Sequence, residues 1–416
     1  MKKSIKLAVV AALALGATSA FATNGSALIG AGAKARGMGG TDIGISHGAE
    51  SALGNGAMIT SVEGTEISFG GTLFMPDVSY QGNPQFSYED SAADMSVIPE
   101  VSIATKINEN FYIGVGMWGT AGMGTDYRDV TGPAGTNANG TFNMVTNLQL
   151  MQFGVPMAYK TGDLSLAVTP VLQYGSLDIN YDYADTTLGG PNSGPGQIGM
   201  GVAQDLQFGF NLGVAYEMDN ITIGAMYKSK IDMEYKGFSD TVAPFTGGLG
   251  YTNDKLSTPA EIGIGASYVI GEHTIALDYK NIQWSDAKGY EDFEWDDQDV
   301  IAIGYQYQAK NWAARVGYNY ASSPISEQNY TGNNSANLAA TTVNMFNLLG
   351  FPAIIESHYT VGGTYAFSKQ TSLDLAFVYA PETTETYKTM DDAGNAYDIS
   401  TKHSQTSLSA QVNFAF

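Results

Sequence analysis

Apolar and polar residues alternate with a period of two along most of the chain after residue 64. In Ile262–Tyr268, Ile301–Tyr307 and Leu373–Tyr379 every second residue is apolar, and most residues between them are small or polar. Such alternation is typical of β-strands whose two faces have different surroundings. It predicts fourteen strands, near residues 65–75, 97–107, 110–127, 144–160, 163–183, 204–218, 220–234, 257–270, 272–286, 297–309, 311–321, 356–367, 370–381 and 403–416.

The connections between these strands are alternately tight and long. Tight turns are expected at 108–110, 160–163, 217–220, 271–273, 309–311 and 368–370, and the other connections are longer. A soluble sandwich also alternates, but its strands are usually shorter, and outer-membrane barrels combine tight turns at one end with long loops at the other. The sequence therefore predicts an all-β, 14-stranded antiparallel transmembrane barrel over residues 64–416. The terminal Phe416 would be its signal to the barrel assembly machinery.

The stretch from Asn24 to Thr60 follows neither the helical nor the strand period. It is rich in glycine and small residues, and it has almost no aromatic side chain. Such a segment cannot offset the conformational entropy of ordering its own backbone. A barrel of fourteen strands has a lumen too wide for its wall side chains to fill. Residues 23–63 are therefore predicted to form a hatch inside the lumen.

The first 22 residues have the pattern of a secretory signal peptide. Lys2, Lys3 and Lys6 precede the apolar run Leu7–Leu15, and Ala20-Phe21-Ala22 is an A-x-A cleavage site. The mature chain should therefore begin at Thr23. The sequence contains no cysteine, so no disulfide framework is expected.

Charge and composition exclude several classes of function. Removal of the three signal lysines from 19 basic residues leaves 16 against 41 acidic ones, a net charge of −25. Such a surface repels nucleic acid. The four histidines lie far apart without metal-ligand spacing, so no metal, cofactor or catalytic activity is expected. The acidic run Glu291–Asp299 could bind divalent cations that bridge lipopolysaccharide, or it could simply be a solvated face.

Several short blocks resemble one transporter family. Asn24-Gly25 and Gly30–Gly40 resemble the N-terminal hatch of FadL-type outer-membrane transporters of long-chain fatty acids and other hydrophobic compounds. Asn55, Gly56 and Ala57 stand where that family usually has Asn-Pro-Ala, without the proline. Three later blocks resemble the family as well, namely Lys255–Ala260, Ala314–Tyr320 and Phe351–Glu356. The resemblance implies a monomeric barrel in contact with outer-membrane lipid that takes up a hydrophobic small molecule passively.

The third predicted strand is unusually rich in glycine, which weakens a strand and often marks a bend. In the family this strand is kinked inward and leaves a lateral opening in the wall. The resemblance implies that the kink here lies at Gly116, Gly119, Gly122 and Gly124, with Trp118 lining the exit. The alternative is that small residues are simply ordinary on a lumen face.

Apolar side chains are predicted in two outer regions. They are Phe142 and Met144 near the start of the fourth strand, and Met345, Phe346, Leu348 and Phe351 in the connection 322–355. Exposed apolar patches normally mark a binding surface, and methionine and phenylalanine suit a ligand without specific shape. These residues could capture a ligand, or the loops could pack on one another and cap the barrel.

The choice of ligand depends on positive charge in the lumen, because a buried carboxylate needs a cation or several N–H donors. The inward basic candidates are Lys34 and Arg36 in the hatch, with Lys280 and Arg315 in the wall. Each could instead be paired with an acidic neighbour. Long-chain fatty acids are the default ligand, and the alternatives are a neutral aromatic or aliphatic hydrocarbon, or a general porin or adhesin.

Overall fold

The computed structural model describes residues 23–130, 141–184, 195–243, 253–329, 335–390 and 395–416. In these residues 19 strand segments form one antiparallel sheet that closes on itself, because β19 pairs with β3. β1, β2 and β4 are two-residue additions, and β7 with β8 and β10 with β11 are parts of single passages. The wall of the described chain is thus a 14-strand barrel, which confirms the predicted fold class.

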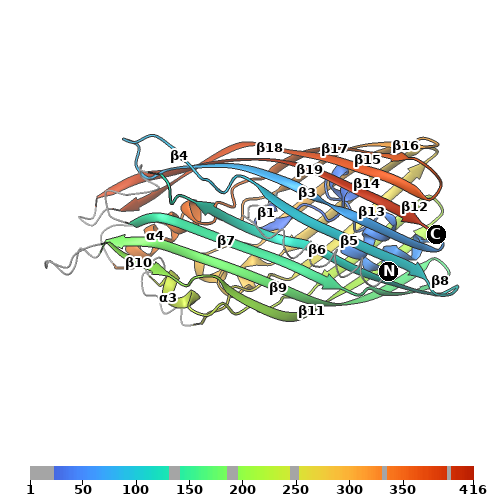
Figure 1. The fold of residues 1–416 in the computed structure, drawn as a ribbon, viewed down its shortest axis with the longest axis horizontal. Helices are drawn as coiled ribbons and strands as arrows, with labels where there is room; N and C mark the ends of the chain where they lie inside the picture. The colour runs from blue at the N-terminus through green and yellow to red at the C-terminus, as the bar shows by residue number, and fades with distance from the viewer. Residues whose placement is uncertain (1–22, 131–140, 185–194, 244–252, 330–334, 391–394) are drawn as a thin grey trace.

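The wall strands follow one another around the barrel in chain order. Their bounds are β3 Thr65–Gln81, β5 Ser96–Lys106, β6 Phe111–Asp126, β7 Thr141–Gly154, β8 Met157–Thr161, β9 Leu164–Ala184, β10 Pro195–Gly199, β11 Ala203–Met218, β12 Ile221–Lys228, β13 Glu261–Ile270, β14 His273–Ile282, β15 Gln298–Gln308, β16 Trp312–Ala321, β17 Ser357–Ala366, β18 Thr371–Met390 and β19 Ala396–Ala415. The tight turns lie at the end of the barrel that holds the C-terminus, and the long connections lie at the other end (Figure 1).

Boundaries of five predicted strands are wrong for a physical reason. β12 ends at Lys228, not at residue 234, and β13 starts at Glu261, where the two strands still pair. Beyond this pair Met233 and Tyr235 are fully buried, so the chain turns into the barrel end. β3, β18 and β19 are longer than predicted, because the polar ends of β18 and β19 continue to pair beyond the apolar band.

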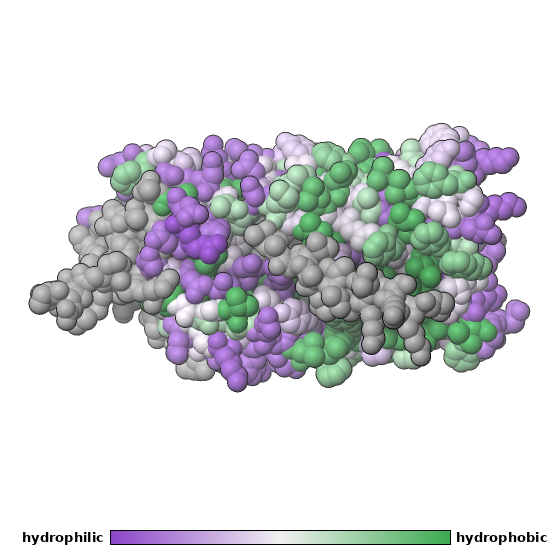
Figure 2. All heavy atoms as spheres, viewed as in Figure 1, coloured by the Kyte–Doolittle hydropathy of each residue, from purple (hydrophilic) through white to green (hydrophobic). Residues whose placement is uncertain are grey.

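The apolar face of each strand points outward. In β13 the side chains of Ile262 and Ile264 are 48% and 59% exposed, whereas Gly263 and Gly265, which alternate with them, are buried. Figure 2 shows apolar residues gathered in a band toward the end with the tight turns, with a polar rim beyond it and a larger polar region at the opposite end. The band is the surface that lipid would cover, and closure satisfies the backbone groups within it.

The end with the long connections is closed by short helices and their side chains. They are α3 Phe238–Val242, η3 Trp284–Asp286, η4 Glu291–Phe293 and α4 Ser335–Leu349. We call the buried apolar side chains at this end the outer apolar cluster. Its aromatic centre consists of Trp284, Tyr290, Phe293, Trp295 and Phe346. The rings of Phe293 and Phe346 stack at 4.3 Å between centroids, and Trp284 meets Tyr290 edge-on at 4.7 Å. No described helix has the length and apolar character needed to cross a membrane.

Residues 23–63, the hatch segment, lie inside the barrel (Figure 1). The segment contains β1 Thr23–Asn24, β2 Ala27–Leu28, the single turn α2 Ala33–Gly37, and two 3-10 helices, η1 Gly48–Leu53 and η2 Gly56–Ser61. Nearly all of its residues are buried. Since its own elements are so short, contacts with the wall must hold it in place.

Candidate transport pathway through the barrel

The hatch segment meets the wall through facing glycines. They are Gly37 against Gly362, Gly39 against Gly317, and Gly44 against Gly265. At Gly39, where φ is +71°, an added Cβ would lie 2.7 Å from the carbonyl oxygen of Tyr318. Backbone thus packs directly on backbone, which only glycine permits. The glycine content that identified the segment in the sequence therefore has a structural reason.

One wall carboxylate accepts hydrogen bonds from three consecutive amides of the hatch segment. Asp278 of β14 accepts from the N–H groups of Asp42 at 2.7 Å, Ile43 at 2.8 Å and Gly44 at 3.4 Å. Ser267 of β13 donates to the carbonyl of Gly44 at 2.7 Å. A buried carboxylate with several N–H partners is well satisfied, so this contact is a strong anchor between hatch and wall.

Asn55 fixes the next part of the segment. Its Nδ2 donates to the carbonyls of Ile43 at 2.9 Å and of Val214 in β11 at 3.0 Å, and its Oδ1 accepts from the amide of Ala57 at 3.1 Å. Asn55 is therefore the N-cap of η2 and also a link to the wall. Gly56 follows directly, and a Cβ there would lie 2.9 Å from Thr169 Oγ1, so the wall leaves little room for the proline of the family pattern.

Arg36 makes the strongest ion pair of the hatch segment. Its guanidinium donates to both carboxylate oxygens of Glu100 in β5, at 2.6 and 2.9 Å, and to Thr72 Oγ1 at 2.6 Å. The amide of Gly32 donates to Glu100 as well, at 3.3 Å. Arg36 and Glu100 are 1% and 0% exposed, so the pair is shielded from water. Arg36 therefore anchors the hatch and has no vacant face for a ligand carboxylate.

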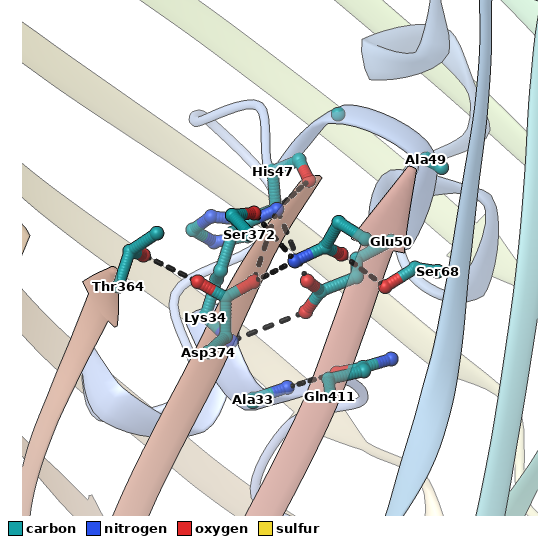
Figure 3. A network of polar contacts seen from close by, with 12 residues as sticks. Ala33, Lys34, His47, Ala49, Glu50, Ser68, Thr364, Ser372, Asp374 and Gln411 are labelled. Carbon is teal, nitrogen blue, oxygen red and sulfur yellow. Dashed lines mark hydrogen bonds and ion pairs between the residues drawn. The ribbon is translucent and has the colours of Figure 1, made fainter. Parts of the chain in front are cut away.

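A second ionic network links the hatch segment to Asp374 of β18 (Figure 3), and it continues to Arg315 of β16. Lys34 Nζ lies 3.2 Å from Glu50 and 3.5 Å from Asp374, and Asp374 lies 3.8 Å from Arg315. Burial raises the pKa of Glu50 to about 7. It lowers the pKa of His47 to about 3, and the His47 ring bonds the carbonyl of Thr41. Lys34 and Arg315 thus share two carboxylates.

Lys280 lies in a small polar chamber between hatch and wall. The chamber is also lined by Asp42, Trp118, Lys228 and Glu261. Lys228 pairs with Glu261 at 3.1 Å, and both Asp42 and Glu261 interact electrostatically with Lys280. Each of the four basic side chains predicted for ligand binding therefore has acidic neighbours within the described structure.

β6, the third wall strand, leaves its neighbour halfway along. Pairing of β5 with β6 runs from Lys106 opposite Tyr112 to Glu100 opposite Trp118 and stops there. β5 continues to Ser96 paired with β3 alone, while β6 continues paired with β7 through a register shift between Gly119 and Ala121. The wall is therefore parted between β5 and the outer half of β6.

The parted half of β6 meets the hatch segment instead. Ala121 pairs with Ala27 of β2, and the amide of Gly122 donates to the carbonyl of Ser26 at 3.0 Å. Of the other glycines named from the sequence, Gly116 lies before the parting, where a Cβ would meet Leu53 of η1, and Gly124 packs on β7. Trp118 is buried at the last residue pair of the seam.

The predicted outer-loop residues are inside the barrel end. Met144, Phe346, Leu348 and Phe351 are buried in the outer apolar cluster, and Met345 packs against it. Phe142 lies in β7, not before it, and its side chain is outside the described part of the structure. Among the described residues these side chains therefore form no exposed apolar patch. The loops pack on one another, which was the alternative left open by the sequence, and capture of a ligand here stays a prediction.

Sequence reasoning missed Glu100 as the partner of Arg36. The available signal was its inward position in a strand of alternating residues, where Val97, Val101 and Ile103 belong to the other face. A carboxylate on a lumen face must be paired when buried. The strand pattern could therefore have marked Glu100 as a contact for a basic hatch residue. It could not have identified that residue as Arg36.

The comparisons with known proteins agree with this architecture. The sequence profile of the family described as "Outer membrane protein transport protein (OMPP1/FadL/TodX)" matches residues 7–333. The chain belongs to this family. The family consists of transporters of the bacterial outer membrane, so this protein is an outer-membrane transporter of hydrophobic compounds.

Individual relatives are distant. A long-chain fatty acid transport protein of Salmonella typhi is 24% identical over 372 residues, which cover 78% of this chain and 80% of that protein. A FadL homologue from Pseudomonas aeruginosa has a TM-score of 0.70 at 14% identity, covering 94% of this chain and 100% of that one. The toluene transporter TodX of P. putida has a TM-score of 0.67 at 19% identity, covering 93% and 99%. At these identities the solved structures establish the fold alone.

Proposed function

We propose that this FadL-family protein takes up long-chain fatty acids or similar hydrophobic compounds by passive diffusion. The ligand enters from the outer loops, binds against the hatch segment, and leaves sideways through the wall between β5 and β6. The observation that carries the proposal is the end of the β5–β6 ladder at Glu100 and Trp118, beyond which β6 bonds the hatch. A hydrophobic ligand that leaves there passes directly into the bilayer.

The hatch anchors support a role in gating. Arg36 binds Glu100, which is the last β5 residue paired with β6, so a hatch movement at Arg36 pulls on the edge of the opening. Pro99 follows on β5 at the first position without a β6 partner. Proline lacks an amide donor and suits the edge of a sheet. Opening thus requires few wall hydrogen bonds to break.

The outer apolar cluster supports ligand capture. It joins methionine, aromatic and aliphatic side chains of the loops to Met123 of β6 and Ala27 of the hatch in one continuous cluster. A ligand that displaces loop side chains would therefore stay in apolar surroundings until it reaches β6. Methionine adapts to such a ligand because its side chain is flexible and polarisable.

The lateral exit is tested by closing it covalently. In the double variant Pro99→Cys, Gly119→Cys, the cysteines occupy the positions that would pair if the β5–β6 register continued by one residue. The matched control is Ile103→Cys, Val115→Cys, a pair that already faces across the same seam. Both chains lack other cysteines. Uptake of a labelled fatty acid is measured in cells before and after reduction.

We expect oxidation to stop uptake in the first variant and reduction to restore it, because the exit would be sealed reversibly. The control should transport in both states. Uptake that continues through an oxidised and verified Pro99–Gly119 disulfide would refute lateral release and favour passage to the periplasm through the lumen.

A neutral hydrocarbon is the second candidate ligand. The supporting observation is that Lys34, Arg36 and Arg315 are paired with carboxylates and Lys280 has acidic neighbours. Competition decides between the candidates, since a fatty acid transporter should prefer an acid to the alcohol of equal chain length. A neutral-hydrocarbon channel should bind both alike or prefer the alcohol.

We also propose a monomer that is inserted by the barrel assembly machinery and is surrounded by lipid and lipopolysaccharide. The acidic run Glu291–Asp299 supports a cation-bridged contact with lipopolysaccharide only weakly. Asp297 already accepts from Ser285, and Asp299 accepts from Tyr279 and Asn281. Light scattering of the detergent-solubilised protein measures the oligomeric state.

A further inference from the structure

Thr23, the residue after the signal cleavage site, is buried in the outer half of the barrel. Its side chain and backbone are 5% exposed, and its nitrogen donates to Gln405 Oε1 of β19 at 3.2 Å. Cleavage after Ala22 changes this nitrogen from an amide to a free α-amino group. In water such a group has a pKa of about 7.7 to 8.0. Burial disfavours its charged form, and an anionic partner favours it. Processing therefore creates an amine that an anionic ligand would keep protonated.

The acceptor of this nitrogen is held in one orientation. His403 Nδ1 lies 2.9 Å from the carbonyl oxygen of Pro352 and must donate to it, so His403 Nε2 carries a lone pair. Gln405 Nε2 lies 3.1 Å from His403 Nε2 and donates to it. Gln405 must then direct its oxygen at Thr23. The residues around the amino terminus form a prepared socket of neutral groups.

The socket contains no carboxylate. The small cavity beside Thr23 has a volume of about 10 Å³, room for about one water molecule. Its lining in the described chain is Thr23, Gly25, Val78, Gly122, Met123, Gly124, Pro352 and His403, none of them acidic. A protonated amine has three donors, and Gln405 accepts from one of them. The lining of the cavity supplies no carboxylate for the remaining donors.

At Thr23 a polar site lies next to apolar side chains, and an amphiphile needs both, one for its head group and one for its tail. Met123 lines the cavity and belongs to the outer apolar cluster. Gly122 and Gly124 in the same lining belong to the half of β6 that has parted from β5. A carboxylate is larger than this cavity, so it would have to displace neighbouring side chains such as Met123. Its apolar tail would then lie among the cluster side chains, next to the proposed exit. The predicted basic side chains lack this freedom, because each has acidic neighbours.

We infer that the α-amino group of Thr23, created by signal cleavage, is the cation that binds the carboxylate of an anionic amphiphile in this transporter. Gln405 positions the amine, and the outer apolar cluster receives the tail. The inference rests on the proposed uptake function and on cleavage after Ala22. It implies that an unprocessed chain lacks the head-group site even when its barrel is folded.

The test removes the amine alone. An N-terminal threonine carries an amine and a hydroxyl on adjacent carbons, and periodate cleaves the bond between those carbons to leave an aldehyde without the amine. The denatured chain beginning at Thr23 is treated with periodate, refolded in detergent and checked by intact mass. Affinities for palmitic acid and for hexadecanol are then measured. The reagent control is the Thr23→Ala chain, which keeps the amine and cannot be cleaved.

We expect the oxidised chain to bind palmitic acid at least tenfold more weakly and hexadecanol within twofold of the untreated chain. In Thr23→Ala, treatment should change neither affinity by more than twofold. Unchanged acid binding after oxidation would refute the head-group role while the proposed function survived. Equal loss of both ligands would also refute it, because the amine would then only seat the hatch. If the untreated chain bound neither ligand, the proposed function would fall together with this inference.

A second variant tests the same group without a reagent. Gln405→Glu places a carboxylate where the amine now finds a neutral oxygen 3.2 Å away. The ammonium would then be paired internally, so acid affinity should fall at least tenfold relative to the Gln405→Asn chain. Equal acid affinity in the two variants would contradict the inference. The signal site itself is checked by N-terminal sequencing of the membrane-extracted protein, and a mature chain starting elsewhere would overturn it.

Discussion

The bidentate pair of Arg36 and Glu100 predicts how firmly the hatch segment is held. Arg36→Met keeps most of the apolar stem and removes two charge-assisted bonds to Glu100 and one bond to Thr72. With the hatch docked, Glu100 would then be a buried carboxylate without its cation. With the hatch undocked, water would hydrate it. The variant should therefore weaken docking more than it weakens the barrel.

The magnitude follows from the burial of both groups. Breaking a buried ion pair from one side costs about 3–5 kcal/mol, because the remaining charge is left unpaired. That cost raises the undocked population by roughly 150- to 5,000-fold. The matched control is Lys160→Met, which breaks the pair with Glu217 in the exposed turn region, at 2.9 Å. Exposed pairs contribute about 0–1 kcal/mol, so the control should change docking by less than tenfold.

Amide hydrogen exchange measures the docking free energy directly. Protection of the amides that bond wall side chains should fall in Arg36→Met, while wall-strand amides keep theirs. These amides belong to Gly32, Ala33, Gly39, Asp42, Ile43 and Gly44. Current through a planar bilayer should rise as the lumen opens. In Arg36→Met, Glu100→Gln both charges are gone, so most of the protection should return. A single variant with less than a tenfold change, or a double variant no better than the single, would refute the argument.

Three further predictions concern the docking of the hatch segment on the wall. Gly39→Ala should lower hatch protection by at least tenfold because its Cβ would meet wall backbone, whereas Gly162→Ala, at a positive φ in open space, should leave hatch protection unchanged. His47 has a pKa near 3 when docked and near 6.5 when exposed, so its own contribution to docking should be constant above pH 6.5 and become unfavourable as pH falls toward 3. Glu50, whose pKa is raised to about 7 when docked, contributes with the opposite sign. The titration of His47→Asn should lack the His47 part of the dependence. Asn55→Ala loses three hydrogen bonds and should weaken docking by about 1–3 kcal/mol, measured by exchange of the amide of Ala57.

The sequence was most informative where one physical factor acts alone. Lipid on one face and a polar lumen on the other impose the period of two, and for this reason the fourteen strands could be predicted. Glycine density likewise predicted a segment that must lie against something else. The bounds of β12 and β13 could not be predicted, because Met233 and Tyr235 continue an apolar pattern that serves the barrel end instead of lipid.

The roles of the charged residues required the fold. Arg36, Lys34 and Arg315 are cations on inward positions, and sequence alone leaves open whether each binds a ligand or a neighbour. The answer depends on their partners. Glu100 lies 64 residues from Arg36 in the chain, and Asp374 lies much further from Lys34. Only barrel closure brings them together. A carboxylate ligand would therefore need a cation that no carboxylate of the described fold already pairs with.

That requirement gives the signal peptide a consequence beyond export. The same cleavage that releases the chain would add a cation away from the carboxylates that pair the other basic side chains, at a residue held by Gln405 beside the parted half of β6. The hatch segment would then do more than close the lumen. Its first residue would carry the head group, its Ser26–Ala27 backbone would hold β6, and its Arg36 would hold β5 through Glu100. A ligand that pairs with the amine would thus bind the same segment that bridges the two sides of the exit.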